Sequence, residues 1–198
     1  MSVLVAKDAP NFTAQAVMPD NSFQEISLSD YKGKYVVLFF YPLDFTFVCP
    51  SEIIAFDKRL EEFKTRNVEV IGVSIDSHFS HLAWKNTAIE NGGIGNVQFP
   101  LVADINKEVT DAFDLRTGPG IALRGSFLID KEGVVQHQVV NNLSLGRDID
   151  EMLRVVDALQ FTEEHGEVCP AGWQKGKSGM KGSTEGVAEY LANNHEEL

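Results

Sequence analysis

Residues 35–50 read Tyr-Val-Val-Leu-Phe-Phe-Tyr-Pro-Leu-Asp-Phe-Thr-Phe-Val-Cys-Pro, and this stretch decides the fold. Its first seven residues form a continuous apolar run of residues that favour β-structure. Such a run is typical of a strand that is covered on both faces of its sheet. Beyond Pro50, apolar side chains recur with helical spacing, at Ile53, Phe56, Leu60 and Phe63. This spacing predicts a helix that reaches about Arg66. A buried strand that leads into a helix predicts an α/β protein.

The pattern of strand and helix continues on the C-terminal side of this stretch. Strands are expected at 68–76 and 99–103, helices at 78–90 and 107–113, and a hairpin of two strands within 123–141. A last amphipathic helix begins near Asp148. We therefore predict a central mixed β-sheet flanked by helices in a domain over residues 1–161. Residues 162–198 are rich in glycine and lysine at first and are predicted to form an extended arm.

The charge balance of the 198-residue chain limits its partners. Seventeen basic and 29 acidic residues give a net charge of −12, which argues against a generic nucleic-acid binder. Lys7 and Asp8 interrupt the N-terminus before an apolar leader could form, and the run 35–41 is too short to span a bilayer. We expect a protein without a membrane segment that remains in the cytoplasm.

Motifs for metals and nucleotides are incomplete. His78 and His81 lie three residues apart on an expected helix without further ligands, so we interpret them as solvated or capping histidines and predict no metal site. Segment 172–178 resembles a phosphate-binding loop but has three residues, not four, between its glycines. No cofactor is expected.

Cys49 is the first candidate for chemistry. It lies where the buried strand meets the helix, with Pro50 after it in a position that suits the first turn. Backbone amides at a helix N-terminus favour a thiolate, and the hydroxyl of Thr46 can reach a sulfur three residues away. The alternative is an inert buried cysteine. Cys169 is the only other thiol in the chain.

Residues 42–49 fit the pattern P-x-x-x-T-x-x-C of the peroxiredoxins. Leu123-Arg124-Gly125, Gly146-Arg147 and the motif at 166–173, Gly-Glu-Val-Cys-Pro-Ala-Gly-Trp, follow in the expected order. The whole chain thus resembles a typical two-cysteine peroxiredoxin of the alkyl hydroperoxide reductase C group. The resemblance implies a thioredoxin-like fold and a thiol peroxidase acting on hydrogen peroxide and organic hydroperoxides.

The resemblance also implies a role for each site residue. Cys49 is the peroxidatic cysteine, and Cys169 of the partner subunit is the resolving cysteine. The supporting residues are expected to stabilise the departing oxygen (Thr46 and Arg124), to wall the sulfur from water (Pro42) and to orient Arg124 (Glu52 and Arg147). Taken singly, either arginine also fits an ordinary surface position, and Glu52 fits a first-turn acid that favours the helix dipole.

The second half-reaction implies partners. A sulfenic acid on Cys49 condenses with a thiol, which by resemblance gives an intersubunit disulfide in a homodimer, with five dimers forming a decamer. No C-x-x-C motif occurs, so a thioredoxin-like or flavoprotein disulfide reductase must regenerate the thiols. A non-enzymatic assembly, either a chaperone or a redox relay, is the alternative function.

Two further elements resemble those that make some family members sensitive to peroxide. Gly92, Gly93 and Gly95 correspond to a Gly-Gly-Leu-Gly element with Ile94 in place of leucine, and Tyr190 to a Tyr-Phe element that has Leu191. We expect intermediate to high susceptibility of Cys49 to overoxidation. An ordinary glycine loop and a plain end helix remain the alternative.

Overall fold

The computed structural model describes residues 2–197, which form two compact units. The first unit ends at Ile149 and the second begins at Asp150. The division that the sequence suggests after residue 161 stays a prediction. None of the described helices is both long and apolar enough to cross a membrane.

The first unit is built on a seven-stranded sheet of order β2-β1-β5-β4-β3-β6-β7. The strands are β1 (Thr13–Val17), β2 (Phe23–Ser27), β3 (Tyr35–Phe40), β4 (Val68–Ser74), β5 (Leu101–Ala103), β6 (Arg124–Ile129) and β7 (Val135–Asn141). β3 pairs parallel with β4 and antiparallel with β6, so the sheet is mixed, as predicted. The predicted hairpin is the antiparallel pair β6–β7.

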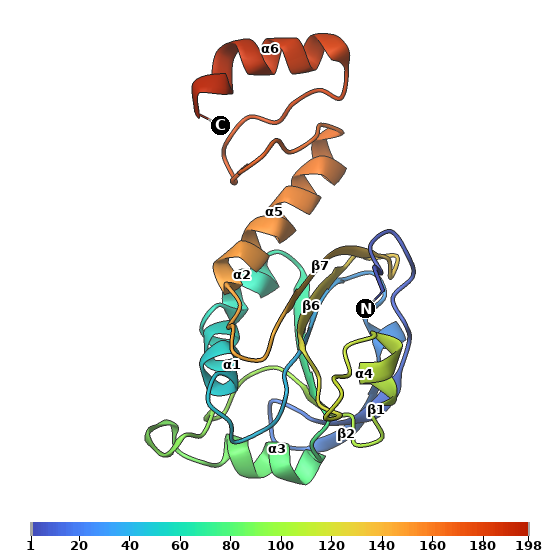
Figure 1. The fold of residues 1–198 in the computed structure, drawn as a ribbon, viewed down its shortest axis with the longest axis vertical. Coiled ribbons are helices and arrows are strands. Elements are labelled where there is room, and N and C mark those ends of the chain that lie inside the picture. The colour runs from blue at the N-terminus through green and yellow to red at the C-terminus, as the bar shows by residue number, and fades with distance from the viewer. Residues whose placement is uncertain (1, 198) are drawn as a thin grey trace. The chain divides into compact units, whose positions relative to one another are not determined.

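All six residues of β3 are buried. Since consecutive side chains point to opposite sides of the sheet, both faces of β3 are covered. Phe39 stacks on Phe56 of α1 (Cys49–Lys58), with ring centroids 4.2 Å apart. Phe40 instead packs at 5.1 Å against Phe113, which directly follows α4 (Glu108–Ala112). In Figure 1, α1 and α2 (Leu60–Thr65) lie on one side of this sheet and α4 on the other. The apolar run therefore places the segment that follows β3 at the edge of a rigid core.

Two predicted helices are shorter in the structure. The helix expected to reach Arg66 breaks at Arg59, whose backbone (φ −103°, ψ 7°) leaves the helical region and whose N–H donates to Phe56 three residues earlier. Helix α3 (His78–Lys85) ends before the predicted Glu90, because Ala88 is extended (φ −63°, ψ 145°). A short 3₁₀ turn, η2 (Ile89–Asn91), follows.

The hairpin β1–β2 was not predicted. Its strands have five residues each, and three of the five in β2 are exposed, so neither shows a clear alternation. The missed signal is the turn Pro19-Asp20-Asn21, in which Asn21 adopts a left-handed conformation (φ 68°) that asparagine tolerates better than most residues. A second 3₁₀ turn, η1 (Leu28–Tyr31), follows this hairpin.

The second unit contains α5 (Ile149–His165), α6 (Thr184–Asn194) and a terminal 3₁₀ turn, η3 (His195–Glu197). Between α5 and α6 the chain has little regular structure, apart from an antiparallel bridge between Val168 and Met180. Helix α5 confirms the amphipathic pattern that begins at Asp148.

Candidate active site

Cys49 is the first residue of α1, directly after the loop that leaves β3. Val48 is the N-cap residue, and Pro50 occupies the first turn, where its missing N–H leaves no donor unsatisfied. Cys49 is fully buried. Because Cys49 is the first residue of α1, the unpaired backbone amides of the helix N-terminus favour negative charge close to its side chain.

Two side chains direct hydrogen-bond donors at the sulfur. The hydroxyl of Thr46 lies 2.9 Å from Cys49 Sγ and 2.8 Å from the carbonyl oxygen of Leu43. Arg124, the first residue of β6, brings Nη1 to 3.3 Å from Cys49 Sγ. Sequence reasoning expected both residues at this site, and the structure brings both within hydrogen-bond reach of the thiol.

Glu52 holds the arginines in a buried network one helical turn after Cys49. Its Oε2 accepts from Arg124 Nη1 at 2.7 Å and from Arg147 Nη2 at 3.0 Å. Its Oε1 accepts from the Nε and the backbone N–H of Arg147, at 2.8 and 2.9 Å. Burial raises the pKa of Glu52, but the hydrogen bonds and charge of Arg147, with the charge of Arg124, outweigh it and lower the pKa overall. Glu52 is thus a buried anion shared by two cations.

Backbone carbonyls complete the coordination of both guanidinium groups. Arg124 Nε donates to the carbonyl of Leu143 at 2.7 Å, and Arg147 Nη1 donates to that of Gly125 at 2.6 Å. Both side chains are at most 4% exposed. The alternative of ordinary surface arginines is therefore wrong for both. Their positions are fixed before any substrate arrives, which is the arrangement that electrostatic catalysis needs.

The loop that carries Thr46 is secured by a network that the sequence analysis missed. His81 of α3 is fully buried, so its interpretation as a solvated or capping histidine is wrong. Its Nδ1 lies 2.8 Å from Asp44 Oδ2, and Tyr41 donates its hydroxyl to Asp44 Oδ1 at 2.9 Å. Pro42, between these two loop residues, is also buried. The sequence signal was an acidic residue, Asp44, inside a loop in which Thr46 is the other polar residue.

The glycines expected to control overoxidation form a tight loop after α3. Gly92 and Gly95 have positive φ angles (82° and 66°), and a Cβ on Gly93 would collide with the carbonyl oxygen of Thr87. The indole N–H of Trp84 donates to the carbonyl of Gly92 at 2.8 Å. The loop thus requires its glycines. Its effect on oxidation stays a prediction.

Cys169 and Tyr190 lie in the second unit. Cys169 is half-buried, and its Sγ lies 3.5 Å from the carbonyl oxygen of Ala158 on α5. Burial raises the pKa of the Cys169 thiol, while the charge of Arg154 partly opposes this rise. Tyr190 is half-buried on α6. Neither Cys49 nor Cys169 forms a disulfide bond in this structure.

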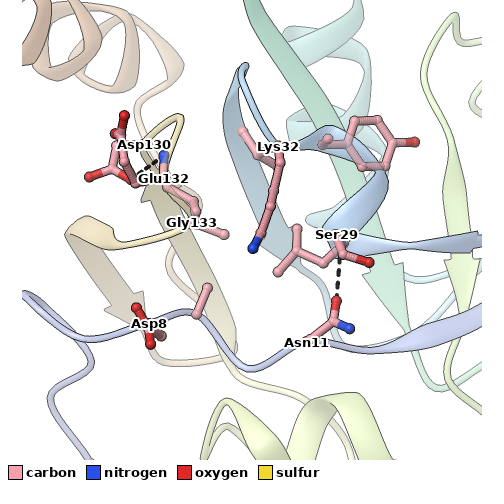
Figure 2. Close-up of a pocket in the computed structure, with 12 residues that line it drawn as sticks. Asp8, Asn11, Ser29, Lys32, Asp130, Glu132 and Gly133 are labelled. Atoms are coloured by element: carbon pink, nitrogen blue, oxygen red, sulfur yellow. Dashed lines mark hydrogen bonds between the residues drawn. The ribbon is translucent and has the colours of Figure 1, made fainter.

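A separate pocket in the first unit holds about 260 Å³ and contains none of the site residues. Figure 2 shows the amine of Lys32 directed into the space, with the backbone N–H of Ser29 bonded to Asn11. Leu28, Val36 and Ile129 supply apolar lining. Among the described residues, no group of three or more His, Cys, Asp or Glu side chains could hold a metal ion.

Comparison with known proteins decides the family. Residues 5–138 match the AhpC/TSA family, and residues 158–193 match the C-terminal domain of 1-Cys peroxiredoxin. This chain is a peroxiredoxin of the AhpC/TSA family. It is 59% identical to an alkyl hydroperoxide reductase C of Helicobacter pylori over 97% of this chain and 98% of that protein. Peroxiredoxin-1 of Gallus gallus is 53% identical over 95% of each chain.

Solved structures agree with this assignment. The reduced 2-Cys peroxiredoxin of Plasmodium vivax has a TM-score of 0.95 and 54% identity, and the match covers 97% of this chain and 100% of that one. The mitochondrial 2-Cys peroxiredoxin of Plasmodium falciparum has a TM-score of 0.81 and 51% identity, covering 84% and 100%. The predicted thioredoxin-like fold and two-cysteine peroxiredoxin type are confirmed. This peroxiredoxin is a peroxidase that acts on peroxides and is reduced by thiols.

Proposed function

We propose that this peroxiredoxin reduces hydrogen peroxide and organic hydroperoxides through Cys49, with Cys169 of a second subunit as the resolving thiol. The Cys49 thiolate attacks one peroxide oxygen and becomes a sulfenic acid, while the other oxygen leaves as water or an alcohol. The Cys169 thiol then displaces the sulfenic oxygen as water, which gives an intersubunit disulfide. An external dithiol returns both sulfurs to thiols.

One observation carries the first step: Arg124 Nη1 lies 3.3 Å from Cys49 Sγ while also bonded to buried Glu52. The same guanidinium stands next to the oxygen pair when a peroxide meets the sulfur. Negative charge then develops on the departing oxygen, and a fixed donor at such a position is worth about 3–4 kcal/mol in the transition state. Thr46, 2.9 Å from the sulfur, supplies a second donor.

The second step requires local opening around Cys49, because the residue is fully buried in its reduced position. The first turn of α1 and the preceding loop are the segments that must loosen. Phe47, two residues before Cys49, is 97% exposed, so this part of the loop has few contacts to break. The chain contains no third cysteine that could compete with Cys169.

We further propose a homodimer, and five dimers in a decamer. An exposed aromatic cluster supports contacts between copies: the ring of Phe23 lies 4.7 Å from His78 and 5.5 Å from Phe79, and Phe79 is 66% exposed. Burial of such rings favours association. Sedimentation of reduced protein should give a mass of ten chains, and a stable dimer at micromolar concentration would contradict the decamer.

The reductant is proposed to be a thioredoxin-like protein or a dedicated flavoprotein disulfide reductase in the cytoplasm. The absence of a C-x-x-C motif supports an external reductase, and a disulfide that turns over needs a reducing compartment. Parallel assays with each reductase should show saturable peroxide loss with one of them. Equal, slow rates with both would contradict a dedicated partner.

Overoxidation is proposed to compete with disulfide formation. The tight loop at 92–95 supports this through Trp84, whose indole N–H donates to Gly92 and whose ring lies 5.7 Å from that of Phe45 in the loop before Cys49. A rigid contact to that loop would slow local opening and leave the sulfenic acid exposed to a second peroxide. Mass spectrometry after turnover in millimolar peroxide should show a gain of two oxygens on Cys49. No such gain would contradict the proposal.

The experiment that tests the function follows peroxide loss with thioredoxin and its reductase for wild type, Cys49→Ser and Cys169→Ser. Cys49→Ser should lose essentially all activity. Cys169→Ser should be oxidised once but form no disulfide-linked dimer on a non-reducing gel. A Cys49→Ser variant as active as wild type would overturn the proposal.

A further inference from the structure

The second unit holds the segment around Cys169 against one face of α5. Arg154, Ala158 and Phe161 lie three or four residues apart and therefore share that face. Cys169 Sγ lies 3.5 Å from the carbonyl oxygen of Ala158, and the ring of Trp173 lies 4.8 Å from that of Phe161. Arg154 Nη1 donates to the carbonyl of Trp173 at 2.8 Å. Residues 169–173 thus lie along this face, with Arg154 at one end.

The guanidinium of Arg154 is held in a fixed orientation. Its Nε and Nη2 donate to the two carboxylate oxygens of Glu151, at 2.6 and 2.7 Å. A bidentate pair of this kind constrains a planar guanidinium far more than a single contact does. The third contact, to Trp173, connects this pair to the segment that carries Cys169.

Arg154 is also the charged group that acts on the Cys169 thiol. Burial raises the pKa of that thiol, and the charge of Arg154 opposes the rise. The titratable side chains of α5 near this segment include Glu151, Asp157, Glu163, Glu164 and His165, whose ring stacks on that of Phe161 at 4.4 Å, and those after α5 include Glu167, Lys175 and Lys177. Lys175 Nζ forms an ion pair with Asp157 Oδ1 at 3.3 Å. Arg154 therefore has two effects on this segment: a hydrogen bond to the Trp173 carbonyl and the effect of its charge on the Cys169 thiol.

We propose that Arg154 is a positioning residue for the resolving step, which holds residues 169–173 on α5 and keeps a cation near the sulfur of Cys169. The inference rests on the proposed role of Cys169. In that step the Cys169 thiolate attacks the sulfenic sulfur of Cys49, the S–S bond forms and the S–O bond breaks. The leaving hydroxide takes up the proton released by the thiol and becomes water. A cation near Cys169 raises the fraction of thiolate available for this attack.

The first test needs no catalysis. In Cys49→Ser, Cys169 is the only thiol, so its rate of alkylation by iodoacetamide against pH gives its titration midpoint. Arg154→Gln should raise the midpoint by about 0.5–1 unit, and Arg154→Lys, which keeps the charge, by less. Lys175→Gln is the matched control, because it removes another link between the same segment and α5 without removing Arg154. It should move the midpoint by less than about 0.2 unit on the same scale.

The second test uses the two-cysteine chain and a pulse of hydrogen peroxide. Arg154→Gln should slow disulfide formation about 3–10-fold at pH 7, since one unit of midpoint is tenfold in thiolate, and the deficit should disappear at a pH above both midpoints. The initial loss of peroxide should be unchanged. Lys175→Gln should form the disulfide within about twofold of the wild-type rate at either pH.

Two outcomes overturn the inference: an unchanged midpoint in a folded Arg154→Gln protein, or an equal shift in Lys175→Gln. A different result separates it from the proposed function. If wild type forms no disulfide, the role of Cys169 fails, whereas the midpoint shift still reports the effect of Arg154 on the thiol. Recovery in Arg154→Lys excludes misfolding as the cause of the Arg154→Gln deficit.

Discussion

The two cysteines have opposite surroundings. Cys49 is fully buried, receives donors from Thr46 and Arg124, and lies one turn from an anion shared by two arginines. Cys169 is half-buried, and the contact of its sulfur is a 3.5 Å approach to a backbone carbonyl. The first sulfur thus receives side-chain donors on a buried charged network, whereas the second has a weak contact with a carbonyl oxygen on α5. This contrast suits a sulfur that reacts with peroxide and a sulfur that attacks the oxidised product.

The largest expected effect comes from removing the cation beside Cys49. Arg124→Met should lower kcat/KM for hydrogen peroxide by about 10²–10³-fold, because a fixed donor to the departing oxygen is lost. Stopped-flow measurement of the reduced protein gives the rate. Arg116→Met is the control, since Arg116 lies at the surface in an ion pair with Asp111 (2.7 Å) and its loss should change the rate less than twofold. A fall of less than about fivefold for Arg124→Met would contradict this role.

The second-largest effect is expected from neutralising Glu52, the anion that the two arginines share, and it concerns the free energy of unfolding. Glu52→Gln leaves two buried guanidinium groups without a full counter-charge and should lower the free energy of unfolding by about 3 kcal/mol. Urea unfolding monitors this change. Glu69→Gln, which disrupts an exposed pair with Lys34, should lower it by less than about 1 kcal/mol. Equal losses for the two variants would show that the buried network stabilises the fold no more than an exposed ion pair does.

Low pH should destabilise the fold through the same side chain, the carboxylate of Glu52. The pKa of Glu52 in the folded protein lies below its ordinary value of 4.5, since the arginines outweigh the effect of burial. Its stabilising contribution is therefore complete above the unfolded-state pKa and is lost as the pH falls through the folded-state value. Wild type should lose more stability than Glu52→Gln between pH 5.5 and about pH 3.5. Parallel curves for the two proteins would contradict the shift.

The smallest effect on the first oxidation is expected at the other thiol. Cys169→Ser should react with peroxide within about twofold of the wild-type rate, because the donors around Cys49 belong to the first unit. Competition with a reference peroxidase measures this rate. A tenfold loss would show that Cys169 contributes before the disulfide forms.

The sequence predicted the parts of the fold that local patterns govern. The run 35–41 implied a strand with two buried faces, and Phe39 and Phe40 do pack on opposite sides of the sheet. The break at Arg59 was hidden because Phe56, Leu60 and Phe63 stay buried across it, so the periodicity continues. Such a local change of backbone leaves no trace in hydrophobic spacing.

The site was less accessible to local reasoning. Position alone made Cys49 and Thr46 candidates, since they are three residues apart at the start of a helix. Arg124 lies 75 residues from Cys49, and only the family resemblance connected them. The same limit explains the error at His81, whose partner Asp44 is 37 residues away and gives no local signal of burial.

The proposed reaction begins with oxidation of the Cys49 sulfur by peroxide. The most direct test treats Cys169→Ser with one equivalent of hydrogen peroxide in the presence of dimedone, which traps sulfenic acids, and maps the adduct by peptide mass spectrometry. The peptide that contains Cys49 should be labelled stoichiometrically. An unlabelled Cys49 with the peroxide still unconsumed would contradict it.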